Sequence, residues 1–246
     1  MHTLSPSRPS RPFTVLLDGM IRPWGITHEW VLEDQTVNWG PLTLTVPVAT
    51  VAPKPKLGPE HEWLQEQLDC LPRIAELAER GHIKCFTTNE IEFETWGRPG
   101  VTGKATEFDL FRNVAIKKIP PAVGRSFLWP FNNGEWKERK DAFLDGIRND
   151  RFLKLKEAIG STHAADIFHL WSAEKAGLDC FLSADRKFIN AVRNQKRVLI
   201  RVCVLSPSEL CERFPHFRLR PRWIVQFLLF KLRSITNFFR KPDSVL

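Results

Sequence analysis

The sequence lacks several features that would place it in a common class of protein. It has five cysteines at wide spacings, no Cys-x-x-Cys pair and no run of 18 uncharged apolar residues. An odd, scattered set of cysteines argues against a disulfide scaffold or a zinc ribbon and favours a reducing compartment. The first twelve residues have no apolar core of the kind that a signal peptide requires. We therefore expect a soluble, cytoplasmic protein.

Motifs of several enzyme classes are also missing. No serine lies in a Gly-x-Ser-x-Gly context, which argues against a serine hydrolase. The glycine-rich segment 97–103 is not followed by Gly-Lys-Ser or Gly-Lys-Thr, so we expect a flexible loop rather than a phosphate loop. No His-x-x-x-His spacing occurs, so a zinc site with paired histidine ligands is not predicted. His169 is expected to be an ordinary helix residue with its hydrogen bonds satisfied.

The net charge of +8 is distributed unevenly. Residues 13–211 carry equal numbers of acidic and basic side chains, so the excess positive charge lies in residues 1–12 and 212–246. Within the neutral part, residues 60–96 are rich in acids and residues 112–156 are rich in bases. This separation suits a protein that brings a polyanion to a bound cation, although two solvated helix faces would give the same pattern.

Short apolar runs alternate with helical patterns along the chain. Buried strands are predicted at residues 13–17, 83–87, 180–183 and 198–205, and helices at 59–81, from 88 or 89 onward, at 141–159, at 166–176 and after 206. This order predicts an α/β fold, a three-layer α/β/α sandwich with a central, mainly parallel sheet.

Three further segments complete the expected organisation. Residues 22–56 are predicted to form a β-rich insertion, as a hairpin or edge strands, since Pro47 and Pro53 argue against a central strand. Residues 97–135 read as a loop with short elements. We divide the chain into a flexible basic arm (1–12), one domain (13–211) and a basic amphipathic C-terminal extension (212–246).

Carboxylates follow several of the predicted strands. Because the loops beyond the carboxyl ends of parallel strands meet at one edge of a sheet, we expect these acids to lie close together. They are Asp18 after the first strand, Glu90 and Glu94 after the second, Asp185 after the third, and Asp166 at the start of the helix before it. Oxygen ligands favour Mg²⁺ or Mn²⁺, which can polarise a phosphate and activate water. Taken singly, each acid also fits a turn, a helix-start charge, an N-cap or an exposed helix position.

Three segments resemble the PIN-domain nucleases, a family that includes the toxins of many bacterial toxin–antitoxin systems. The most specific is residues 164–188, AADIFHLWSAEKAGLDCFLSADRKF, which resembles the family's Asp-containing helix, strand and Ser-x-Asp-x-x-Phe ending. Residues 13–21, FTVLLDGMI, resemble its opening strand with a metal-binding Asp, and residues 86–97, FTTNEIEFETWG, its second strand followed by an acidic helix. Met20 departs from the small polar residue that the family usually has there.

The resemblance implies a divalent-metal-dependent endonuclease of the PIN type that hydrolyses phosphodiester bonds in RNA, or alternatively in DNA. Asp18, Glu94, Asp166 and Asp185 would be catalytic metal ligands, with Glu90 as the alternative to Glu94. Arg186, Lys187, Arg151 and Lys154 would contact the nucleic-acid backbone. An antitoxin-like protein or a second copy are the protein partners it suggests. The alternative is a catalytically inactive PIN-like binding or scaffold protein, which Met20, the insertion and the basic ends would suit.

Two apolar features remain outside that scheme. Trp24, Trp30 and Trp39 in the insertion offer surfaces on which bases could stack, although most tryptophans simply pack in cores. Residues 218–240 place apolar side chains at helical steps among basic residues. We expect this C-terminal helix to dock on protein, with peripheral contact to an anionic membrane as the less favoured alternative.

Overall fold

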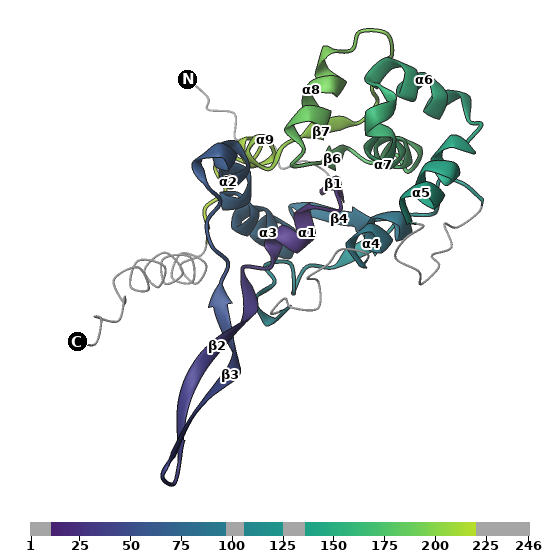
Figure 1. Ribbon diagram of the computed structural model, residues 1–246. Helices are drawn as coiled ribbons and strands as arrows, with labels where there is room; N and C mark the ends of the chain where they lie inside the picture. Colours follow the sequence, from purple (N-terminus) through teal and green to yellow (C-terminus); the bar gives the residue numbers. More distant parts are fainter. Residues whose placement is uncertain (1–10, 97–105, 125–135, 220–246) are drawn as a thin grey trace, which may run out of the picture.

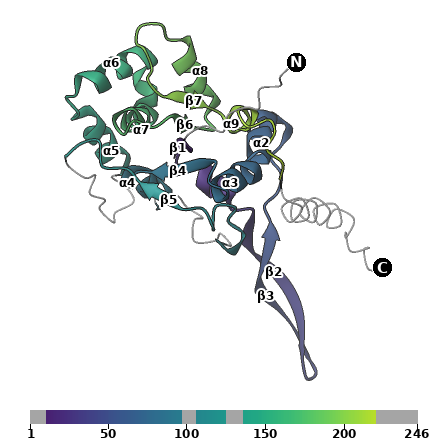
Figure 2. The ribbon, with the colours of Figure 1, turned by 180° about the vertical axis from the view of Figure 1, so that it is seen from behind.

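The chain folds around a five-stranded parallel sheet, seen edge-on in the ribbon views (Figures 1 and 2). The computed structural model describes residues 11–96, 106–124 and 136–219. The sheet strands are β1 (Phe13–Leu17), β4 (Ile83–Thr87), β5 (Ile116–Lys118), β6 (Cys180–Leu182) and β7 (Cys203–Leu205). Their order across the sheet is β5-β4-β1-β6-β7, and every adjacent pair is parallel. The predicted α/β class with a central parallel sheet is confirmed.

Helices cover both faces of this sheet. They are α1 (Ile21–Gly25), α2 (Glu62–Asp69), α3 (Leu71–Glu79), α4 (Asn89–Trp96), α5 (Trp136–Asp145), α6 (Asp150–Ile159), α7 (Ala164–Lys175), α8 (Arg186–Asn194) and α9 (Pro207–Glu212). Single-turn 3₁₀ segments lie at Pro59–His61, Thr106–Phe108 and Ser161–His163.

Strand β1 shows why the sheet is buried on both sides. Successive side chains of a strand point to opposite faces. Leu16 packs in one core cluster with α6, α7 and α8, whereas Val15 and Leu17 pack in a second cluster with α1, α3 and α9. All three side chains are buried. The arrangement is compatible with a three-layer sandwich.

Two of the predicted helices are interrupted. The helical pattern over 59–81 becomes a 3₁₀ turn, α2 and α3, because the chain breaks at Cys70 and Pro72 occupies the first turn of α3. The pattern over 141–159 becomes α5 and α6. Asn149 caps α6 by accepting hydrogen bonds from the backbone N–H groups of Arg151 and Phe152, so a new helix starts there.

Other boundaries also differ from the predicted ones. Strand β5 was not predicted, since it has three residues, two of them lysines, at the sheet edge. The strand expected over 198–205 is restricted to Cys203–Leu205. Helix α1 occupies the start of the range assigned to the insertion, so the β-rich part begins at His28.

The insertion is a long antiparallel hairpin that projects from the body (Figure 1). Strands β2 (His28–Trp39) and β3 (Leu42–Pro53) each have 12 residues and pair over their whole length. Gly40 turns the chain at the tip with φ +60°, a conformation that favours glycine. At the base, the His28 ring stacks on Phe108 with 3.9 Å between centroids. The hairpin is therefore anchored at one end only.

None of the helices in the described ranges is long and apolar enough to cross a membrane. The helix expected over 218–240, the glycines of 97–103 and most of the arm at 1–12 lie outside the described residues.

Candidate metal centre

The acids predicted to meet lie at the carboxyl ends of the three central strands. Strand β1 has β4 on one side and β6 on the other, and the chain connections run in opposite directions from it. At such a switch point the loops on either side diverge and leave a crevice for ligands. Asp18 follows β1, Glu94 lies on α4 after β4, and Asp185 follows β6.

Asp18 is buried, and a residue in the loop after β6 donates a hydrogen bond to it. The Ser183 hydroxyl donates a hydrogen bond to Asp18, with 2.7 Å between Oγ and Oδ2. Burial raises the pKa of Asp18, while the Ser183 hydrogen bond and the charge of His169 oppose that rise. A buried carboxylate of this kind is stabilised when a cation neutralises it.

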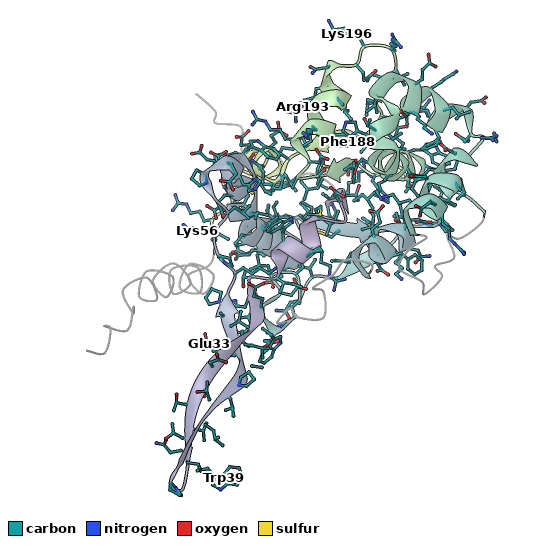
Figure 3. The ribbon with its side chains drawn as sticks, in the orientation of Figure 1. Glu33, Trp39, Lys56, Phe188, Arg193 and Lys196 are labelled. Carbon is teal, nitrogen blue, oxygen red and sulfur yellow. The ribbon has the colours of Figure 1, made fainter. Side chains whose placement is uncertain are left out.

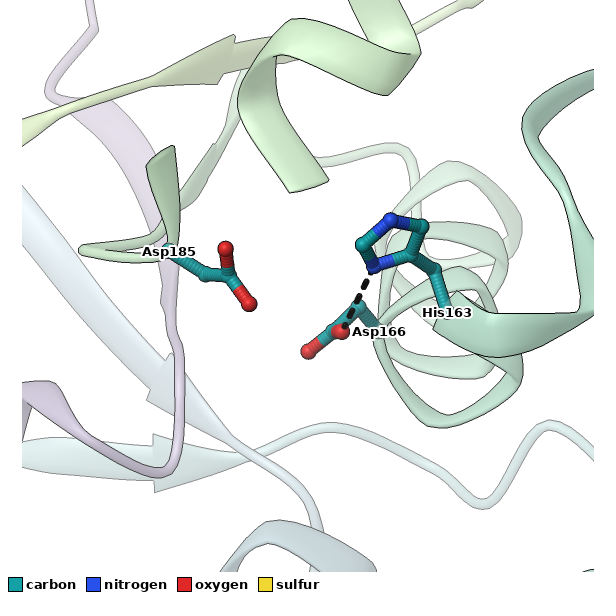
Figure 4. Close-up of side chains that lie close together, drawn as sticks. All are labelled: His163, Asp166 and Asp185. Carbon is teal, nitrogen blue, oxygen red and sulfur yellow. Dashed lines mark ion pairs between the residues drawn. The ribbon is translucent and has the colours of Figure 1, made fainter. Parts of the chain in front are cut away.

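His163, Asp166 and Asp185 form the tightest group of potential ligands. One ligand atom from each lies within 4.8 Å of the others (Figure 4). His163 Nδ1 is 3.8 Å from Asp166 Oδ2, and the two side chains point toward Asp185 across a short gap. An imidazole nitrogen and two carboxylates could bind a divalent metal ion.

Asp185 also has a structural role. Its Oδ1 accepts hydrogen bonds from the backbone N–H groups of Lys187 (2.8 Å) and Phe188 (3.0 Å), which makes it the N-cap of α8. The N-cap interpretation of this acid is therefore confirmed. It does not compete with metal binding, because these two bonds leave the second carboxylate oxygen, Oδ2, for another ligand.

Asp166 interacts electrostatically with every other acid predicted for the site except Glu90. Its position in the first turn of α7 buries most of its side chain, and that burial raises its pKa to about 7. The negative charges of Asp18, Asp185 and Glu94 add to the rise. The structure therefore brings Asp18, Glu94, Asp166 and Asp185 into one electrostatic cluster.

Glu94 is held by two cationic groups that the sequence did not link to it. Lys140 Nζ donates a hydrogen bond to Glu94 Oε1 at 2.9 Å, and His169 Nε2 lies 3.4 Å from Glu94 Oε2. Burial acts to raise the pKa of Glu94, but the charges of His169 and Lys140 outweigh it and lower that pKa to about 2. Glu94 is therefore ionised at neutral pH.

His169 is not the satisfied helix residue that was expected. It is 2% exposed, and neither ring nitrogen makes a hydrogen bond to a described residue. Burial acts to lower its pKa, but the charges of Glu94, Asp18 and Asp166 raise it. The carboxylates around His169 therefore favour the protonated form of its imidazole, against the effect of burial.

Glu90, the alternative acid of α4, lies one turn before Glu94. Both line a pocket with Lys140 and His169, and Glu90 Oε1 is buried with no hydrogen-bond partner among the described residues. The charge of Glu94 raises the pKa of both Asp18 and Asp166. This electrostatic coupling supports Glu94 as the α4 acid of the site.

His163 is the potential ligand that sequence reasoning missed. It ends the 3₁₀ turn before α7, three residues ahead of Asp166, and its ring packs on Phe188 with 5.7 Å between centroids. The signal was the His-x-x-Asp spacing, which places both side chains on one face of a helical segment. This spacing is not one of the His-x-x-x-His or Glu-x-x-His patterns that are typical of zinc sites.

The basic residues expected to contact a nucleic-acid backbone have different surroundings. Arg186 and Lys187 are exposed directly after Asp185, and the Arg186 guanidinium lies 5.8 Å from the centre of the Trp63 ring. Lys154 is exposed on α6. Arg151 instead forms a two-point ion pair with Glu174 at 2.6 and 2.7 Å, which commits its guanidinium to the fold. Backbone contact by these residues stays a prediction, and the ion pair does not favour it for Arg151.

Comparison with known proteins identifies no relative. No protein-family model, curated protein or solved structure matches this chain. The chemistry of the site therefore rests on the residues and contacts described above.

Proposed function

We propose that the protein is a divalent-metal-dependent endonuclease with a PIN-like fold, and that it hydrolyses phosphodiester bonds in RNA. The observation that carries the proposal is the His163–Asp166–Asp185 group at the carboxyl edge of the sheet, with Asp18 and Glu94 close enough to perturb the pKa of Asp166. Acids whose pKa values are perturbed by burial and by neighbouring charges, as those of Asp18, Glu94 and Asp166 are, are typical of functional sites.

The donor set fits Mg²⁺ or Mn²⁺, the cofactors that we propose. When bound, such a cation polarises a phosphate and lowers the pKa of water. Asp166 and Asp185 supply oxygen ligands and His163 a nitrogen, while the Asp18 carboxylate adds negative charge beside them. Ser183 orients Asp18 through its hydrogen bond. These residues would therefore both bind the metal ion and orient the carboxylate beside it.

The exposed cations next to the site indicate the substrate class. Arg186 and Lys187 follow Asp185 directly, so a phosphate backbone held by them would pass over the carboxylates. We propose single-stranded or structured RNA as the substrate, in the cytoplasm. Binding of an antitoxin-like protein or of a second copy of the chain stays a prediction, because no feature of the described surface identifies either partner.

Cleavage of a labelled single-stranded RNA in Mn²⁺ tests the proposal. Asp18→Asn, Asp166→Asn and Asp185→Asn should each lower the rate at least about 10–100-fold, the loss that follows even when a supporting residue of a metal site is removed. Asp145→Asn is the matched control, because Asp145 is an exposed acid that pairs with Lys156 outside the site. Activity that survives all three site variants belongs to a contaminant. A parallel assay with single-stranded DNA of the same sequence decides between the two substrates.

One observation favours the alternative, a catalytically inactive PIN-like binding protein. Lys140 and His169 already neutralise Glu94, so part of the cation's role is filled by the chain itself. An inactive protein should show neither RNA cleavage nor Mn²⁺-dependent stabilisation, whereas a nuclease should show both, and the second should disappear in Asp166→Asn.

A further inference from the structure

The outer half of the β2–β3 hairpin has one apolar face and one polar face. In an antiparallel pair, directly opposed residues share a face, as do residues two apart along a strand. By the observed register, one face carries Val37, Trp39, Leu42, Leu44 and Val46, with Gln35 opposite Val46, and we call it the hairpin face. The opposite face carries Thr36, Asn38, Thr43, Thr45 and Asp34 with Pro47.

The hairpin face is exposed to solvent among the described residues. Trp39 is 77% exposed and Leu42 62% exposed, and Figure 3 shows Trp39 at the tip, away from the body. A two-stranded hairpin with a bare apolar face is marginally stable alone, and an antiparallel sheet with one apolar face normally packs that face on another element. The hairpin face is therefore a candidate docking surface.

We propose that the C-terminal segment of this chain, residues 220–246, packs on the hairpin face. Charge complementarity selects this occupant. The hairpin contains Glu29, Glu33 and Asp34 and no Lys or Arg between His28 and Pro53. The C-terminal segment has six Lys or Arg residues against one acid, Asp243, and apolar residues recur along it at helical steps: Ile224, Phe227, Leu228, Ile235 and Phe238.

The same charges disfavour other occupants. A nucleic acid would meet acidic side chains and no cation, so base stacking on Trp39 is not favoured. A second copy of the hairpin would bring two acidic ribbons together. The C-terminal segment instead offers cations that can pair with Glu33, which lies on the hairpin face, while its apolar side chains cover Trp39 and Leu44.

The segment is long enough and starts in a suitable place. Leu219, the last described residue, packs against the same core cluster as Trp24, which lies just before the hairpin. The 12-residue strands are about 40 Å long, and a helix of the segment's length would be about 40 Å as well. The partner surfaces therefore match in length.

Hydrogen exchange of the full-length protein tests the proposal. Amides of residues 224–239 should exchange at least about tenfold more slowly than in a free peptide of the same sequence. Leu44→Asp should abolish this protection. Its matched control is Thr45→Asp, the same change one residue along on the opposite face, which should preserve it. Amides of β1 report whether each variant remains folded, and Phe238→Asp, at the distance along the helix that matches the outer half of the hairpin, should speed exchange in residues 37–46.

Several results would overturn the proposal. One is that the amides of residues 224–239 in the unmodified protein exchange as fast as in the free peptide. Another is that Leu44→Asp and Thr45→Asp lose protection to the same extent. Protection that appears only where sedimentation shows a doubled mass would assign the hairpin face to a second copy. Protection that requires phosphatidylserine vesicles and is indifferent to Leu44→Asp would assign the segment to a membrane surface. None of these results depends on nuclease activity.

Discussion

Ser183 donates its hydroxyl hydrogen to Asp18 across 165 residues of sequence, with 2.7 Å between the two oxygens. The same hydroxyl oxygen accepts a hydrogen bond from the backbone N–H of Asp185 at 3.1 Å. One buried serine thus fixes the carboxylate after β1 and the loop that carries the carboxylate after β6. It supports Asp18 even though Met20 occupies the position where a small polar residue was expected.

Replacing this serine should weaken both the fold and the metal site. Ser183→Ala leaves a buried Asp18 oxygen without its partner, which should lower the free energy of unfolding by about 1–3 kcal/mol. Metal affinity should fall about tenfold, because Asp18 and Asp185 lose their orientation. Urea denaturation and Mn²⁺ titration measure the two effects. Ser172→Ala is the control, since Ser172 is equally buried but bonds only the Phe168 carbonyl. Equal effects in both variants would contradict the positioning role.

The metal-free protein should lose stability as the pH rises toward 7. Burial raises the pKa of Asp166 from 3.8 to about 7, so the folded protein keeps a proton that the unfolded chain has released between those values. The free energy of unfolding therefore falls with rising pH over that window. Asp166→Asn removes this loss, and the variant should be more stable than the parent at pH 8 by an amount whose upper limit is about 4 kcal/mol.

Urea denaturation in a chelator at pH 4 and pH 8 measures this difference. The exposed-acid variant Asp145→Asn should follow the parent at both values, since it leaves Asp166 in place. Parallel pH profiles for the parent and Asp166→Asn would show that Asp166 is not the group responsible.

His163 should set the preference between metal ions. Imidazole nitrogen binds transition metals better than Mg²⁺, which prefers oxygen ligands. His163→Ala should therefore weaken Mn²⁺ binding about tenfold and change Mg²⁺ binding much less. Calorimetric titration with each ion measures both affinities. His61→Ala, an exposed histidine beside Glu60, is the control. An equal change for both ions would mean that His163 does not contact the metal.

Removing the lysine that holds Glu94 should strengthen metal binding. Lys140 places a positive charge 2.9 Å from Glu94, and that charge opposes a second cation nearby. Lys140→Met should therefore bind Mn²⁺ more tightly, by about tenfold for a change of about 1.4 kcal/mol. Lys156→Met, which breaks the pair with Asp145 elsewhere, is the control. Weaker binding in Lys140→Met would show instead that the lysine holds Glu94 in position.

The sequence by itself determined the class of fold and the place of the acids. Short apolar runs that end at turn residues locate β1, β4 and β6, because burial of a strand leaves a local pattern. Asp18 and Asp185 lie one and three residues after their strands and Glu94 on the helix after β4, and the geometry of parallel sheets alone predicts that they converge. The opening of α7 at Asp166 is likewise a local signal.

Only the tertiary structure decided which side chains touch. The contacts of Glu94 with Lys140 and His169 join segments 46 and 75 residues apart, and no local spacing encodes them. Strand β5, and the restriction of the predicted 198–205 strand to Cys203–Leu205, are defined by pairing with a neighbour rather than by local composition. A helix or strand forms from interactions within a few residues, whereas the neighbours of a side chain depend on how elements pack across the sheet, and packing is a property of the whole chain.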